Sequence, residues 1–142
     1  IGKGMGMNVI GWNRTKRPEV DVPVVDIDTL LSRADIVSMN LTLGDETRGF
    51  LSADRIARMK KGAIYVNTAR GALADEAALI AALESGHIRH AGLDVFHNEP
   101  LPPDHALAKL ENVTLSAHAA FRTPEASETL LRRAIDIVKA IS

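Results

Sequence analysis

The chain has 142 residues, of which 46% are hydrophobic and 25% charged, a net charge of −1 and no cysteine. This length suits one domain, and the near-zero charge provides no general attraction to nucleic acid or to an anionic membrane. No apolar run reaches the length of a transmembrane helix, and the lack of cysteine excludes disulfides and thiolate metal sites. We therefore expect a cytoplasmic protein with neither nucleic-acid nor membrane partners.

Short β-rich runs alternate with helical patterns along the chain. The runs expected to form strands are residues 8–12, 22–26, 35–41, 63–68, 90–96 and 113–118. The segments expected to form helices are residues 27–34, with Asp28 near the start, 52–62, 75–86 and an amphipathic tail from Thr123. Ser52 and Asp75 are expected to cap their helices, which Gly62 and Gly86 then end.

This alternation predicts an α/β fold in which a parallel sheet carries helices on both faces. The run 35–41 is apolar on both sides, as expected of a strand buried in such a sheet. Ligands of these sheets bind at the carboxyl ends of the strands. The first candidates for a site are therefore the residues at those ends, namely Trp12-Asn13-Arg14, Asn40-Leu41-Thr42, Thr68-Ala69-Arg70, Asp94-Val95-Phe96 and Ala117-His118.

Arg70 stands in "VNTARGALADEAAL", where a strand gives way to a helix. One interpretation is a solvated loop arginine, the common fate of this residue type. The other is a binding residue, because a guanidinium at a strand end can hold a carboxylate through its forked donors. Gly71, which follows, would allow the backbone to approach a ligand closely.

His118 ends the last expected strand, at the same edge as Arg70. A lone histidine is usually structural, but this one is placed to exchange protons with a ligand near neutral pH. Glu99 lies in the preceding loop and is either a turn carboxylate or a partner that stabilises the imidazolium. The other histidines, which we expect at the surface, are His87, His90, His97 and His105.

Asp94 is a carboxylate within an apolar run, and its burial without a partner would be costly. A ligand or a backbone donor is therefore expected beside it. Other kinds of site have no support, because the sequence lacks H-E-x-x-H, H-x-x-x-H and G-x-S-x-G patterns, and we predict no metal. The glycines of "IGKGMGM" do not fit G-x-G-x-x-G, precede a strand and are expected to end a helix.

Four stretches together resemble the D-isomer-specific 2-hydroxyacid dehydrogenases: "DETRGFLS", "MKKGAIYVNTARGALADEAALIAALESGHI", "AGLDVFHNEPLPPDHAL" and "NVTLSAHAAFRTPE". They follow the family's order over nearly the whole chain. The resemblance implies an NAD(P)-dependent oxidoreductase that interconverts a small 2-oxo acid and a D-2-hydroxy acid by hydride transfer. It implies that Arg70 binds and polarises the substrate, that His118 is the general acid/base, and that Glu99 pairs with His118.

The resemblance also implies a cofactor site. Thr68, Ala69 and Asp94 match positions lining the nicotinamide. The remaining cofactor residues are predicted at the ends of two other strands, namely Asn13, Arg14, Thr15, Leu41 and Thr42. NAD-preferring members carry an acid at the end of the 8–12 strand, whereas here Asn13 and Arg14 are followed by Thr15, Lys16 and Arg17. We predict a preference for NADP(H), with NAD(H) as the alternative. The other interpretation of these basic residues is an ordinary surface loop.

The chain departs from the family pattern in two respects. It lacks a proline near Thr42, and Ala117 and Phe121 stand where many members have other residues around the histidine, so the substrate stays open. It also lacks a first strand and its glycine-rich turn. We therefore expect residues 1–142 to be a partial dinucleotide-binding domain with a Rossmann-like doubly wound sheet, inactive or nearly so alone, whose final helix (about 123–142) returns toward an absent substrate domain.

Two other functions stay open. The fold also serves relatives as a non-catalytic, corepressor-like scaffold that binds a dinucleotide, and a folded remnant without a ligand is a third interpretation. Arg70, Glu99 and His118 together favour an enzyme, because a binding protein needs no acid/base pair. By resemblance, the intact protein is expected to be a homodimer joined through its cofactor domain.

Overall fold

A computed structural model describes residues 1–15 and 21–141 of the chain, with the side chain of residue 141 left aside. The helical elements are η1 (Lys3–Met5), α1 (Ile27–Arg33), α2 (Ala53–Arg58), η2 (Gly71–Leu73), α3 (Glu76–Glu84), α4 (Ala106–Lys109) and α5 (Pro124–Ile141). The strands are β1 (Ile36–Met39), β2 (Ala63–Asn67), β3 (Ile88–Leu93) and β4 (Val113–Leu115). All strand pairings among them are parallel, in the order β1-β2-β3-β4, which confirms the predicted α/β fold with a parallel sheet.

The helix boundaries follow from side-chain caps. Ser52 accepts a hydrogen bond from the Arg55 backbone N–H at the start of α2, and Asp75 accepts one from Ala78 at the start of α3, as predicted. The cap of α1 is Asp26, with Asp28 in the first turn. Helix α2 ends at Arg58, before the predicted Gly62, which adopts a positive φ in the following turn.

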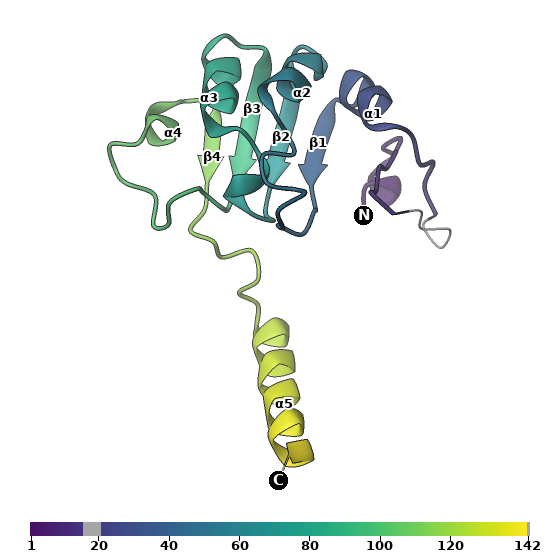
Figure 1. The fold of residues 1–142 in the computed structure, drawn as a ribbon, viewed down its shortest axis with the longest axis vertical. Helices are drawn as coiled ribbons and strands as arrows, with labels where there is room; N and C mark the ends of the chain where they lie inside the picture. Colours follow the sequence, from purple (N-terminus) through teal and green to yellow (C-terminus); the bar gives the residue numbers. More distant parts are fainter. Residues whose placement is uncertain (16–20, 142) are drawn as a thin grey trace.

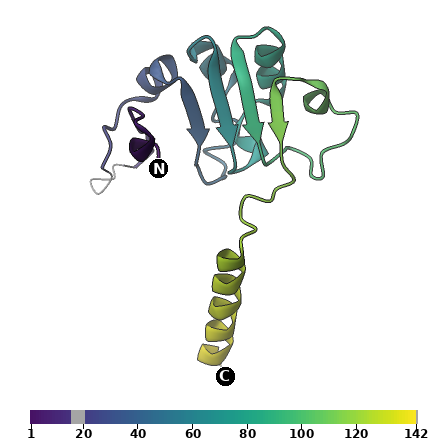
Figure 2. The same cartoon turned by 180° about the vertical axis from the view of Figure 1, so that it is seen from behind.

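Helices α1, α2 and α3 lie over one face of the sheet, and the view from behind shows the strands uncovered (Figures 1 and 2). The prediction of helices on both faces is therefore wrong for the described part of the chain. The strand order advances in one direction, so right-handed crossovers place every connecting helix on the same side. Accordingly, Val37 and Met39 are buried while Ile36 and Ser38 are exposed, so β1 is not buried on both faces as expected.

The core fills the space between this face and its helices. Tyr65 and Ile88 from the sheet and Leu31, Leu73 and Leu107 from the helical layer are at most 2% exposed. Burial of these side chains supplies the main driving force for folding, at about 1.5–3 kcal/mol for each large aliphatic residue. Leu107 belongs to α4, a single helical turn that is not among the helices predicted from the sequence.

The first two predicted strands are not strands in the structure. Residues 8–12 and 22–26 meet only through a parallel bridge between Gly11 and Val24. The Gly11 N–H donates to the Pro23 carbonyl and the Val25 N–H to the Gly11 carbonyl, both at 2.9 Å. Pro23 has no N–H to extend the ladder, and no described strand joins this bridge to β1. Gly6 ends η1 with a φ of 78°, in line with the prediction that these glycines end a helix.

Helix α5 begins after Thr123, whose hydroxyl accepts a hydrogen bond from the Ala126 N–H, and it extends away from the sheet (Figure 1). The helix predicted from Thr123 onward is thus confirmed. Its large apolar side chains are 52–69% exposed, namely Leu130, Leu131, Ile135, Ile137 and Val138. Within the described ranges, no helix is both long enough and apolar enough to cross a bilayer.

Candidate active site

The carboxyl ends of the strands meet at one edge of the sheet, where the arrowheads of Figure 1 point. Arg70 follows β2, Asp94 follows β3, and His118 follows β4. The last two strands end at Leu93 and Leu115, three residues before the ends predicted from the sequence. The chain therefore turns before it reaches His118, and the turning residues build the site.

His118 and Glu99 form the central pair of this edge. The imidazole Nδ1 lies 2.6 Å from Oε2 of Glu99, and the other carboxylate oxygen accepts a hydrogen bond from the Phe96 backbone N–H at 2.9 Å. The bond to His118, followed by the bond from Phe96, holds the pKa of Glu99 below its usual value. Both side chains are about one-third exposed, so the pair is anchored on the protein while it still faces solvent.

Asp94 holds the turn that carries His118. Its side chain accepts hydrogen bonds from the Ser116 hydroxyl at 2.5 Å and from the backbone N–H groups of Ala119 and Ala120 at 2.9 Å. Burial raises the pKa of Asp94, but these three bonds outweigh it and leave the pKa below its usual value. His118 itself adopts a φ of 50°, a left-handed conformation that is uncommon outside glycine. The backbone donors expected beside Asp94 are thus present.

Arg70 lies on the neighbouring loop with its side chain exposed, and its guanidinium Nη1 donates to the Ala69 carbonyl at 2.6 Å. The positive charge of Arg70 contributes to the lowered pKa of Glu99, after the larger effects of His118 and Phe96. The structure thus brings together the three residues predicted to carry the chemistry. Asn67, which is 2% exposed, fixes the loop by donating to the Arg70 carbonyl and accepting from the Ala69 N–H.

Gly71 permits a close approach, although of a different kind from the one expected. A Cβ at this position would lie 2.2 Å from the Phe96 carbonyl carbon and 2.6 Å from the His97 nitrogen. The backbone that approaches is the chain's own, so the prediction of room for a ligand at Gly71 is corrected. His97 reinforces the contact, since its Nε2 lies 3.0 Å from the Ala74 carbonyl oxygen.

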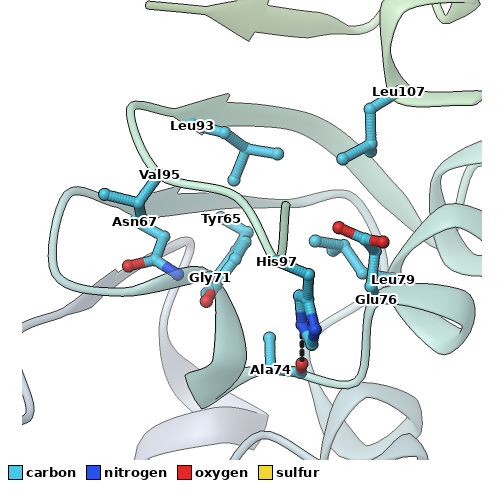
Figure 3. Close-up of a pocket in the computed structure, with 10 residues that line it drawn as sticks. All are labelled: Tyr65, Asn67, Gly71, Ala74, Glu76, Leu79, Leu93, Val95, His97 and Leu107. Atoms are coloured by element: carbon cyan, nitrogen blue, oxygen red, sulfur yellow. Dashed lines mark hydrogen bonds between the residues drawn. The ribbon is translucent and has the colours of Figure 1, made fainter. Parts of the chain in front are cut away.

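Two cavities border this contact, one lined by His97 and the other by Phe96. The smaller, of about 20 Å³, is lined by Tyr65, Asn67, Glu76 and His97 among others (Figure 3). The larger, of about 680 Å³, is bordered by Glu99 and His118 and has an apolar wall. Its apolar wall includes Pro100, Leu101, Pro102, Pro103, Ala108 and Leu115. The larger cavity therefore gives the His118–Glu99 pair an accessible, partly apolar surrounding.

The predicted cofactor residues are divided between the ends of β1, β2 and β3 and the segment after the Gly11 bridge, which is not a strand end. Thr42 and Thr68 are exposed, Ala69 is half-buried, and Leu41 packs partly against the core. The Asn13 side chain donates to the Thr15 carbonyl at 2.7 Å. Arg14 is ion-paired with Glu46, a residue that sequence analysis missed because nothing in the sequence indicates their contact. Lys16 and Arg17 of the predicted basic cluster lie outside the described residues.

Of the remaining histidines, His97 is exposed as expected from the sequence, whereas His87, His90 and His105 are half-buried, and all four are hydrogen-bonded. Each histidine has one hydrogen-bond partner: the Ile56 carbonyl for His87, the Thr114 hydroxyl for His90, the Ala74 carbonyl for His97 and the Leu107 N–H for His105. His105 also lies 3.3 Å from a carboxylate oxygen of Glu76. Apart from the local bond of His105 at the start of α4, these contacts join residues far apart in the sequence and could not be predicted from it.

Comparison with known proteins shows which family the chain is similar to. Residues 1–120 match the model of the NAD binding domain of D-isomer specific 2-hydroxyacid dehydrogenases. The chain is 43% identical over 139 residues to a glyoxylate reductase of Aeropyrum pernix, which covers 95% of the chain and 41% of that protein.

Solved structures give the same result. A D-isomer specific 2-hydroxyacid dehydrogenase of Xanthobacter autotrophicus in complex with NADPH is 44% identical, with a TM-score of 0.76 over 80% of this chain and 37% of the other. D-lactate dehydrogenase of Lactobacillus jensenii with NAD⁺ is 33% identical, with a TM-score of 0.88 over 94% of this chain and 45% of the other. The chain spans about two-fifths of the length of its relatives. On the match to residues 1–120 and these likenesses, the chain belongs to the D-isomer specific 2-hydroxyacid dehydrogenase family.

Proposed function

We propose that this chain is the cofactor-binding part of an NAD(P)-dependent oxidoreductase that interconverts a small 2-oxo acid and a D-2-hydroxy acid. The observation that carries the proposal is the 2.6 Å contact between His118 and Glu99, with the positive charge of Arg70 close enough to act on Glu99. A dinucleotide-binding scaffold would have no use for such a pair, so the contact supports an enzyme over the corepressor-like alternative.

Each of the three residues has a distinct task. The forked guanidinium of Arg70 binds the substrate carboxylate and polarises the neighbouring 2-oxo group. His118 donates a proton from Nε2 to the substrate oxygen when the 2-oxo acid is reduced, and accepts it in the reverse direction. Glu99, bonded to Nδ1, fixes the orientation of the ring and stabilises its charged form. These groups thereby hold the substrate and its transferring proton in a single geometry.

The strand ends fit a dinucleotide by the chemistry of their donors. Hydroxyl groups of Thr42 and Thr68 are exposed at this edge, and Arg14 offers a cation beyond the Gly11 bridge. When bound, the nicotinamide supplies the hydride that reduces the substrate. The ribose of the adenosine half would be held by Asn13, Arg14 and Thr15, and the part of the cofactor next to it by Leu41 and Thr42. The nicotinamide half would be held by Thr68, Ala69 and Asp94.

We further propose that NADP(H) is preferred to NAD(H), because Asn13 and Arg14 follow the 8–12 segment, where NAD-preferring members carry an acid that would repel a 2′-phosphate. One solved relative is in complex with NADPH and another with NAD⁺, so the family accommodates both dinucleotides. The intact protein is proposed to be a cytoplasmic homodimer, with α5 directed toward a substrate domain. Competitive titration with NADPH and NADH tests the preference, and tighter binding of NADH would contradict it.

The test of the catalytic assignment joins this chain to the substrate domain of a glyoxylate reductase and assays reduction of glyoxylate or hydroxypyruvate by NADPH. We expect turnover that falls by about two to four orders of magnitude in His118→Asn, the range typical of a lost general acid. Asparagine tolerates a left-handed backbone, so this variant preserves the φ of 50°. Unchanged turnover in the variant would refute the role of His118.

A further inference from the structure

Arg14, the residue proposed to meet a 2′-phosphate, already has a negative partner in the protein. Its Nη1 is paired with Oε2 of Glu46, 32 residues further along the chain. The two side chains are 61% and 76% exposed, so an incoming anion can reach both of them. Glu46 belongs to the turn that follows β1, so the pair links this turn to the segment after the Gly11 bridge, the two places proposed to hold the adenosine half of the cofactor.

The turn carrying Glu46 is held in place on both sides. Thr47, which is 6% exposed, accepts a hydrogen bond from the Gly44 N–H at 2.8 Å and donates to the Thr42 carbonyl at 2.7 Å. Phe50 stacks on Trp12 with ring centroids 4.8 Å apart, and Trp12 lies two residues before Arg14. The Glu46 turn and the Arg14 loop are therefore fixed next to each other, independently of their ion pair.

This arrangement creates a competition. A 2′-phosphate at Arg14 carries up to two negative charges and must either displace the Glu46 carboxylate or bind beside it, where like charges repel. NADH has a neutral hydroxyl at the same position and meets no such repulsion. The geometry points to Glu46 as a specificity-determining residue that weakens binding of NADPH relative to NADH. This inference rests on the proposed binding of the cofactor at Arg14.

The experiment compares the chain with its Glu46→Gln variant by titration with NADPH and NADH, followed through the emission of Trp12, the single tryptophan of the sequence. We expect the variant to bind NADPH about two- to fivefold more tightly, as for the loss of an exposed ion pair, and NADH with unchanged affinity. The gain should shrink as salt is added, since exposed charges are screened. Asp45→Asn is the matched control, because it removes the adjacent charge and leaves the Arg14–Glu46 pair in place.

The possible outcomes distinguish failure of the inference about Glu46 from failure of the proposed cofactor site. Equal NADPH affinity in wild type and Glu46→Gln, or weaker binding in the variant, overturns the inference and leaves the proposed function intact. The inference is also overturned if Asp45→Asn raises the affinity for NADPH as much as Glu46→Gln does, or if Glu46→Gln raises the affinity for NADH equally. The effect would then come from the general surface charge. If wild type binds neither dinucleotide, the proposed cofactor site fails together with the inference. In Arg14→Gln, the gain from Glu46→Gln should largely disappear.

Discussion

Nδ1 of His118 lies 2.6 Å from Oε2 of Glu99, on a carboxylate whose second oxygen is bonded to the Phe96 N–H. Because the bond to His118 is the largest cause of the lowered pKa of Glu99, His118→Asn should raise the Glu99 pKa toward its usual value. Carbon-13 NMR titration of the Glu99 carboxyl measures this directly in the chain. An unchanged pKa in the variant would mean that the contact is not maintained in solution.

Asp94→Asn should destabilise the fold, because an amide offers only one oxygen to the three donors that now bond the carboxylate, and its NH₂ faces backbone N–H groups. At 3% exposure we expect a loss of about 2 kcal/mol in the free energy of unfolding, measured by urea denaturation at pH 7.

The same carboxylate sets a pH dependence. The folded-state pKa of Asp94 lies below its unfolded value, so its contribution is complete above the unfolded pKa of about 3.9. It is lost as the pH falls through the lower folded value. Wild type should therefore lose its advantage over Asp94→Asn below about pH 4. A difference between the two proteins that stays constant from pH 7 to pH 3 would contradict the proposed role of the charge.

Gly71→Ala should destabilise the protein by about 3 kcal/mol, since its Cβ would collide with the backbone of Phe96 and His97 rather than with a movable side chain. Gly44→Ala is the control, because a Cβ there meets nothing within 4 Å. Thermal and urea denaturation of both variants decide the matter. Similar stabilities would show that the two loops are less closely packed than the structure indicates.

Arg70→Lys should raise KM for the 2-oxo acid about tenfold to a hundredfold, because a single ammonium cannot reproduce the forked contact with a carboxylate. Steady-state kinetics of the enzyme joined to a substrate domain give KM and kcat separately. Arg48→Lys, in an exposed turn, serves as the control for the loss of a guanidinium elsewhere on the protein. A KM equal to that of wild type would exclude Arg70 from substrate binding.

Part of this site follows from the sequence alone. Each strand end is marked by a change from apolar to polar residues, and parallel strands place Arg70 and His118 at one edge because their carboxyl ends coincide. Caps such as Asp75 are equally local, since one side chain bonds a backbone N–H three residues away. The positions of α1 to α3, of β1 to β4 and of the edge that carries the site could therefore be predicted from the sequence, whereas the strands expected at 8–12 and 22–26 could not.

The remaining features depend on contacts between distant segments. The sequence leaves open whether Glu99 meets His118, and the pairing of Arg14 with Glu46 depends on two loops 32 residues apart. The strand predicted at residues 8–12 is absent for the same reason. Its residues have the right composition, but a strand forms only where neighbouring backbone is available to pair with it, and here that is limited to the bridge at Gly11.

The contact of Gly71 with the Phe96–His97 peptide also bears on how substrate preference can change during evolution. Because the Arg70 and Glu99 loops share this contact, an insertion or deletion in either would disturb the proposed substrate-binding arginine and the proposed acid/base pair at once. Tolerated variation is therefore expected at Phe121, which is 63% exposed and touches the edge of the His118 ring, and at the neighbouring Ala117. New substrates would then be accommodated around a fixed catalytic frame.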